Sequence, residues 1–184
     1  MRWLLPMMLF AVLLHADAVD GRQPLHDAVY AQDEALTLKL LEEGADINVE
    51  NAAGLTPLHM AIKLRDLHMA QLLLDHGADI NAQDNRGNTV LILAIKKRNL
   101  EIVKFVVVRG ADVDLSNDDG ISPLHQAAFT GDERIVAFLL TVGADPTVKN
   151  PDGYTPYDFA VAKKNKAAAN ELQTYREKKH AGNH

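Results

Sequence analysis

Residues 55–87, LTPLHMAIKLRDLHMAQLLLDHGADINAQDNRG, decide the fold, because the same pattern returns every 33 residues along the chain. One glycine series, each member followed by Ala-Asp, falls at Gly44, Gly77, Gly110 and Gly143. A second series, ten residues further on, falls at Gly54, Gly87, Gly120 and Gly153. A fixed period of this length predicts an array of repeated supersecondary units that share one continuous core.

Each unit has the pattern of two antiparallel helices followed by a projecting turn. A proline such as Pro57 suits the first helical turn, where its missing N–H would be unpaired, and the Thr or Ser before it caps the helix. The second helix carries an apolar stripe that we expect in the core, formed in successive units by Leu36, Leu40 and Leu41; by Met69, Leu73 and Leu74; by Ile102, Val106 and Val107; and by Ile135, Leu139 and Leu140. The first glycine ends that helix, and a finger leads to the second glycine.

The unit openings resemble the ankyrin repeat, whose signature is Thr-Pro-Leu-His-x-Ala. Residues 56–59 and 122–124 with His125 match it, and the alanine follows at Ala28, Ala61, Ala94, Ala127 and Ala160. The resemblance covers about residues 22–172. It implies an all-α repeat solenoid of about five stacked ankyrin repeats, at about residues 22–54, 55–87, 88–120, 121–153 and 154–179, with a tail at 180–184.

Some positions depart from the family pattern. In the third repeat, Val90 and Ile92 replace the Pro and His of the signature, which suggests an apolar contact in place of a polar one. The junction between the two helices usually carries Gly, which only Gly131 keeps here; the other four junctions hold Gln32, Arg65, Arg98 and Lys164. A non-glycine residue in left-handed geometry costs about 1 kcal/mol, which favours a different closure at those four. The polar second helix of the last repeat, residues 164–179, has the composition of a cap.

The first 18 residues have the features of a cleavable signal peptide. Arg2 precedes an apolar run of 12 residues, Trp3 to Leu14, and residues 16–18 form a small-x-small cleavage site. We therefore expect residues 1–18 to be removed and residues 19–184 to form an exported repeat domain, in a bacterial periplasm or, alternatively, secreted. Retention as a membrane anchor is the weaker reading, because a bilayer span needs about 20 helical residues.

Composition excludes several classes of function. The chain has no cysteine, so it holds no disulfide, no thiolate metal site and no cysteine nucleophile. Its 19 basic and 25 acidic side chains give a net charge of −6, which argues against nucleic-acid binding, since that needs a basic surface. A 47% apolar content is enough for one folded domain, which we expect to be monomeric when free and not stably inserted in a membrane.

Catalytic and metal-binding patterns are weak. His26, His59 and His125 occupy the same signature position in three repeats, where the resemblance implies a structural hydrogen-bonding role. The acidic stretch at residues 112–120 has Asn117 where a calcium loop requires glycine at its sixth position. No nucleophile elbow or phosphate-binding glycine loop is present. We predict a protein that is not an enzyme and that uses neither a cofactor nor a metal.

The resemblance implies a partner-binding surface on the concave face, made of finger tips and first helices. The candidate positions there are Tyr30, Leu55, Met60, Leu64, Arg86, Asn88, Lys96, Lys97, Asp118, Asp119, Ile121, Phe129 and Tyr154, with Phe159 at a further free position. Apolar and aromatic members favour an interface, although some could instead pack between repeats. A basic band beside two aspartates suits a partner of complementary charge, or is simply a solvated surface; its members are Arg86, Lys96, Lys97 and Arg98.

These expectations lead to two functional hypotheses. The first is a periplasmic inhibitor or self-protection (immunity) protein that binds an exported hydrolase or toxin, as some small exported bacterial ankyrin proteins do. The second is a periplasmic scaffold or stress-protection accessory without inhibitory activity. A single tight protein partner would favour the first, and several weak partners the second.

Overall fold

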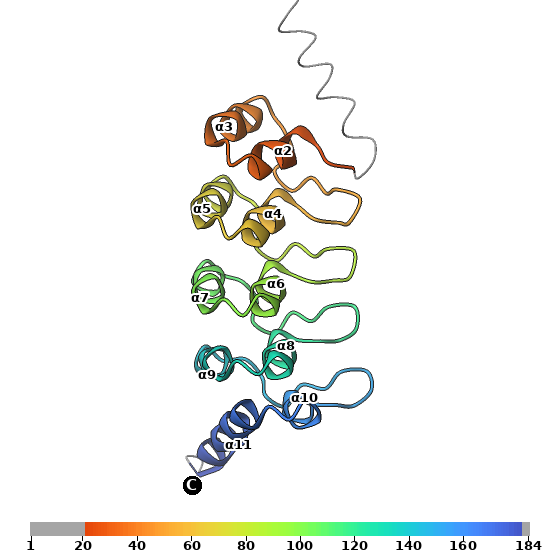
Figure 1. Ribbon diagram of the computed structural model, residues 1–184, viewed down its shortest axis with the longest axis vertical. Helices are drawn as coiled ribbons and strands as arrows, with labels where there is room; N and C mark the ends of the chain where they lie inside the picture. Colours follow the sequence, from red (N-terminus) through yellow and green to blue (C-terminus); the bar gives the residue numbers. More distant parts are fainter. Residues whose placement is uncertain (1–20, 182–184) are drawn as a thin grey trace, which may run out of the picture. The chain divides into compact units, whose positions relative to one another are not determined.

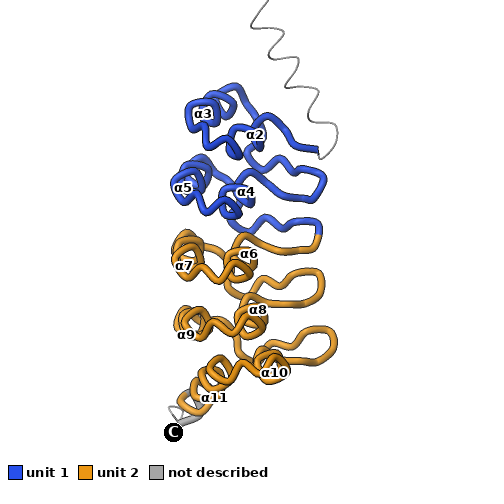
Figure 2. Tube along the Cα trace, viewed as in Figure 1, with its two compact units in different colours: residues 1–85 blue, residues 86–184 orange. Residues whose placement is uncertain are grey.

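The structure, a computed structural model, describes residues 21–181, and all regular secondary structure in this range is α-helical (Figure 1). This confirms the predicted all-α repeat architecture. The predicted signal peptide at residues 1–18 lies outside the described residues. No helix in the described range is long and apolar enough to cross a bilayer. The chain divides into two compact units, residues 1–85 and 86–184, shown in blue and orange in Figure 2.

The first unit contains two helix pairs, and each pair is followed by a finger. Its helices are α2 (Pro24–Tyr30), α3 (Glu34–Glu42), α4 (Pro57–Leu64) and α5 (Leu67–Asp75). Within each pair the two helices pack together, and α2 also packs against α4. The core between them is closed by fully buried side chains, among them Leu25, Leu58, Ile62, Met69 and Leu73.

The second unit contains three helix pairs. Its helices are α6 (Val90–Lys96), α7 (Leu100–Val108), α8 (Pro123–Thr130), α9 (Glu133–Thr141), α10 (Pro156–Ala162) and α11 (Lys166–Ala181). First helices pack in succession, α6 on α8 and α8 on α10, and second helices do the same from α7 to α11. Helix α11 begins two residues later than predicted and continues past residue 179 to Ala181, so the predicted tail at 180–184 is partly helical.

The signature residues form the predicted caps. Thr56 and Ser122 each accept a hydrogen bond from the backbone N–H of the histidine three residues on, and that histidine accepts one back through Nδ1. The Nε2 atom of His26 lies 2.7 Å from the carbonyl oxygen of Leu55. Since a carbonyl only accepts, Nε2 carries the proton and donates. The signature histidine therefore has the structural role that the resemblance implied. In the third repeat Val90 and Ile92 are fully buried, which fits the expected apolar contact.

The four non-glycine junctions do adopt left-handed geometry, so the prediction that they close differently was wrong. Their φ angles lie between 54° at Arg98 and 62° at Arg65, close to the 73° of Gly131. The reason is the hydrogen bonding that this geometry permits. At Arg65, for example, the N–H of Asp66 donates to Ala61 O over 3.0 Å, and the Asp66 carboxylate then caps α5 at Met69 N. These bonds offset the backbone cost of about 1 kcal/mol.

The apolar stripe is also incomplete in the first repeat. Leu36 is 38% exposed, Leu40 and Leu41 are half-buried, and only Thr37 of α3 is buried. The prediction of a core stripe there was wrong, because α3 packs chiefly against α2 within the described residues and has no other helix over its outer side. In the later repeats the stripe is core, except that Leu74 and Val107 are half-buried.

Candidate binding surface

In the first unit the predicted surface residues divide between exposed and buried positions. Tyr30, at the end of α2, is exposed, with the Arg22 guanidinium 5.6 Å from its ring centre, and Leu64 at the end of α4 is also exposed. Met60 is half-buried. Leu55 is only 9% exposed, and its main chain is fixed by Asn51 Oδ1 at 3.1 Å and by the bond from His26. The prediction that Leu55 faces a partner is therefore wrong, because its side chain is buried.

In the second unit Asn88 also proves to be a structural residue. It is 2% exposed, and its Oδ1 accepts hydrogen bonds from Lys96 Nζ at 2.7 Å and from Asn117 Nδ2 at 3.2 Å. Asn88 is therefore not a contact for a partner, which corrects the prediction. Lys96 is exposed, but its ammonium group is engaged by Asn88. The other members of the basic band, Arg86, Lys97 and Arg98, are exposed as well.

The predicted acidic positions lie on the finger that precedes α8. Asp118 and Asp119 are both exposed, and the N–H of Asp118 donates to the carbonyl oxygen of Arg86 over 3.2 Å, so this finger is joined to the first residue of the second unit. Ile121, two residues further on, is half-buried. The surface of this part of the unit thus carries both signs of charge next to each other, with little exposed apolar area.

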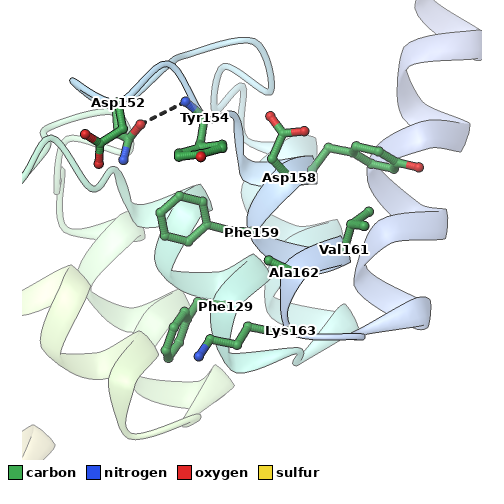
Figure 3. Close-up of a pocket in the computed structure, with 10 residues that line it drawn as sticks. Phe129, Asp152, Tyr154, Asp158, Phe159, Val161, Ala162 and Lys163 are labelled. Carbon is green, nitrogen blue, oxygen red and sulfur yellow. Dashed lines mark hydrogen bonds between the residues drawn. The ribbon is translucent and has the colours of Figure 1, made fainter.

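The last two predicted residues, Phe129 and Tyr154, line a common hollow, which we call the aromatic groove (Figure 3). It has a volume of about 530 Å³ and is open to solvent. Its walls come from α8 (Phe129), from the last finger (Asn150, Asp152, Tyr154) and from α10 and the residue after it (Tyr157, Asp158, Phe159, Val161, Ala162, Lys163). Phe129, Tyr154 and Phe159 were predicted from the sequence, whereas Tyr157, Asp158 and Lys163 were not. The signal that could have found Asp158 is its position, since three other repeats have histidine there.

Hydrogen bonds and ring contacts hold the groove in place. Phe159 packs edge-on against buried His125, with ring centres 5.1 Å apart, and lies 6.5 Å from Phe129. The Lys163 ammonium sits 4.3 Å from the centre of the Phe129 ring. At the finger, Asn150 Oδ1 accepts the N–H of Tyr154 over 2.9 Å, the bond drawn in Figure 3. Aromatic faces and charged groups are thereby presented on a fixed frame.

Two titratable groups at the groove have shifted pKa values. Burial lowers the pKa of His125 below its usual value, although the bond to Tyr154 and the nearby Asp158 charge act in the opposite direction. Hydrogen bonds from the backbone and hydroxyl of Thr155 lower the pKa of Asp158, which is therefore ionised at neutral pH. A neutral imidazole thus lies behind the groove, and a charged carboxylate lies on its wall.

The arrangement is suited to holding a macromolecular surface. Phe129 and Tyr154 are 44% and 56% exposed, and aromatic side chains in such positions are frequent anchors of protein interfaces. Within the described residues no three His, Asp or Glu side chains come together as a metal-binding group.

Comparison with known proteins identifies the family of the chain. A family model described as "Ankyrin repeats (3 copies)" matches residues 25–117 and 101–181, which together span almost the whole described part of the chain. No curated protein gives a significant match.

Proposed function

Because this chain belongs to the ankyrin-repeat family, whose repeats form protein-protein interaction modules, we propose that it is an exported inhibitor or self-protection protein. Its partner would be a hydrolase or toxin of the periplasm. The proposed binding surface is the face of the second unit that carries first helices and fingers, and it includes the aromatic groove of the last two repeats. Binding there would cover the reactive site of the partner.

The observation that carries the proposal is the exposure of Phe129 and Tyr154 in one groove. Burying two aromatic side chains on association removes apolar surface from contact with water. Aromatic residues of this kind tend to supply much of the binding free energy of protein interfaces. Their frame is already ordered by the His125 and Asn150 hydrogen bonds, so little conformational entropy would be lost when a partner docks.

Export is supported by the sequence alone. The basic residue, apolar run and small-x-small site of residues 1–18 have the form of a signal peptide, and a chain without cysteine avoids crosslinks in an oxidising compartment. Recovery of the protein from the periplasm with Val19 at its N-terminus would support this part of the proposal. Recovery from the cytoplasm with residues 1–18 attached would contradict it.

The scaffold or stress-protection hypothesis remains the second candidate. Its support is the mixed charged surface around Lys97, Asp118 and Asp119, which suits weak contacts that salt would screen. A scaffold of this kind would bind several partners without changing their activity.

The test is an affinity capture with the exported protein, produced as the full-length chain, from periplasmic extract at moderate and high salt. One stoichiometric hydrolase or toxin retained at both salt concentrations, whose activity falls when the chain is added, is the expected result. The double variant Phe129→Ala/Tyr154→Ala should lose both binding and inhibition. Val108→Ser, which changes an exposed apolar side chain on α7, is the control and should keep both. Diffuse recovery that disappears at high salt would favour the scaffold.

A further inference from the structure

Helix α10, the first helix of the last repeat, differs from α8 at the position of the signature histidine. In α8 the signature His125 donates through Nε2 to the carbonyl oxygen of Tyr154, in the following finger. In α10 the equivalent residue is Asp158. It keeps the local capping role, because its Oδ2 accepts hydrogen bonds from Thr155 N at 2.8 Å and from Thr155 Oγ1 at 2.7 Å. The side chain that donates toward the next element in α8 is thus replaced in α10 by one that can only accept.

The position beside Asp158 is also open. After α10 the chain turns into the long helix α11, which packs on α10 and α9, and no finger follows within residues 21–181. Within that range, no hydrogen bond reaches the second carboxylate oxygen, Oδ1. Its acceptor capacity is therefore available, and the carboxylate is ionised at neutral pH because the Thr155 bonds lower its pKa. A group that fills this place must donate hydrogen bonds.

The groove walls next to Asp158 favour a cation with an apolar stem. Figure 3 shows Asp152 and Tyr154 on the finger and Asp158 on the neighbouring turn of α10, with the Phe159 ring between the rings of Tyr154 and Phe129. The positive charge of Lys163 lies over Phe129, at the other end of the groove. Among the described residues no cation lies over the Tyr154 ring. The end of the groove near the finger therefore combines two carboxylates with an exposed aromatic face.

We propose that this end of the aromatic groove binds an arginine side chain of the partner protein, with the guanidinium paired with Asp158 and stacked on the face of the Tyr154 ring. Arginine fits better than lysine, because its planar guanidinium both pairs with a carboxylate and stacks on an aromatic ring. More distant positive charges, Lys149 and Arg176, act on Asp158 but make no ion pair with it within 4.0 Å in the described residues. The assignment rests on the proposed protein-binding function and specifies the chemistry of its partner.

The test uses the full chain and a defined probe, the capped peptide acetyl-Gly-Arg-Gly-amide, with amide chemical shifts followed by NMR. The control peptide carries citrulline, which has nearly the same shape as arginine but no charge. We expect saturable shifts of Tyr154 and Asp158 with the arginine peptide, and binding at least about tenfold weaker with citrulline. Raising the salt concentration should weaken only the arginine peptide.

Three variants complete the test. Asp158→Asn keeps an oxygen that can accept the Thr155 bonds but removes the charge, and it should weaken binding of the arginine peptide about tenfold. Tyr154→Leu keeps an apolar wall without the ring and should also weaken it. Glu101→Gln removes one exposed carboxylate from the first turn of α7 and should change nothing. If Asp158→Asn proves unstable on thermal unfolding, Tyr154→Leu decides alone.

Equal binding of the two peptides, unchanged binding by Asp158→Asn, or the absence of saturable shifts would overturn the arginine assignment. The proposed function is tested separately by the captured partner. A partner that binds the wild type and Asp158→Asn equally would leave protein binding intact and refute the arginine site. Binding of the arginine peptide without capture of any hydrolase or toxin would support the arginine site and contradict the proposed inhibitor function.

Discussion

The Nε2 atom of His125 donates to the carbonyl oxygen of Tyr154 over 2.9 Å, so a buried imidazole fastens α8 to the finger of the next repeat. The other ring nitrogen accepts the N–H of Ser122 at 3.3 Å, and Phe159 packs edge-on against the same ring. One side chain thus fixes the helix start, the finger and one wall of the aromatic groove. The stability of the last repeats and the geometry of the groove depend on the same contacts.

Replacing this histidine should be costly. His125→Ala removes one of the two donors to the Tyr154 carbonyl, the other being Asn150 N–H, leaves the Ser122 N–H without its ring acceptor and opens a cavity beside Phe159. We therefore expect a loss of about 2–4 kcal/mol in the free energy of unfolding. Equilibrium unfolding in urea measures it. His76→Ala, at the exposed end of α5, is the control and should cost less than about 1 kcal/mol. Similar losses of stability in both variants would show that the hydrogen bond from His125 to Tyr154 contributes little to the free energy of unfolding.

Stability should also depend on pH through His125. Burial lowers its folded-state pKa below the ordinary value of 6.5, so between these two values the unfolded chain binds a proton that the folded chain does not. The contribution of neutral His125 to the free energy of unfolding is complete above pH 6.5 and declines as the pH falls below that value. The stability difference between the wild type and His125→Gln should therefore shrink from pH 7 to pH 5 in urea unfolding. A stability difference that stays constant from pH 7 to pH 5 would contradict the lowered folded-state pKa of His125.

The sequence predicted the repeats well because their signals are local. A capping threonine, a proline in the first turn and a histidine three residues after the cap act within one helix turn, and the structure has these contacts at Thr56 and Ser122. Burial at Leu55 and Asn88 was not predictable in this way. Both are fixed by groups from other segments, such as the His26 ring and Asn117, which only the folded chain brings near.

The left-handed junctions and the groove show the same limit. Propensity gave the cost of positive φ at Arg98, but not the hydrogen bonds that offset it. Phe129 and Tyr154 could be selected as exposed positions, yet their meeting with Asp158 and Lys163 depends on how α10 packs against α8. Distances between repeats, rather than residue types, decide which exposed side chains form one site.

The junctions offer a paired stability test. Gly131→Ala should destabilise the chain by about 1–3 kcal/mol, because φ is 73° and the new Cβ would lie 2.6 Å from Cγ of Asn165. Arg98→Gly, at the equivalent junction one repeat earlier, should stabilise it by about 0.5–1 kcal/mol, since glycine adopts φ near 54° without strain. Thermal unfolding of both variants measures the two signs. Stabilisation by Gly131→Ala would mean that the Asn165 side chain is displaced without cost.

Asn165 itself ends α8 from outside, because its Nδ2 donates to the carbonyl oxygens of Ala128 and Phe129, both over 2.9 Å. Asn165→Ala leaves these carbonyls without that donor and should cost about 1–3 kcal/mol in urea unfolding. Asn165→Asp has nearly the same shape but places a negative charge beside two acceptors, so at pH 7 it should cost more than alanine. The new carboxyl group gains a favourable donor when it is protonated, which raises its folded-state pKa; the aspartate variant should therefore recover stability relative to alanine as the pH falls toward 4. If the two variants remain equally stable at both pH values, the amide donor of Asn165 does not stabilise the end of α8.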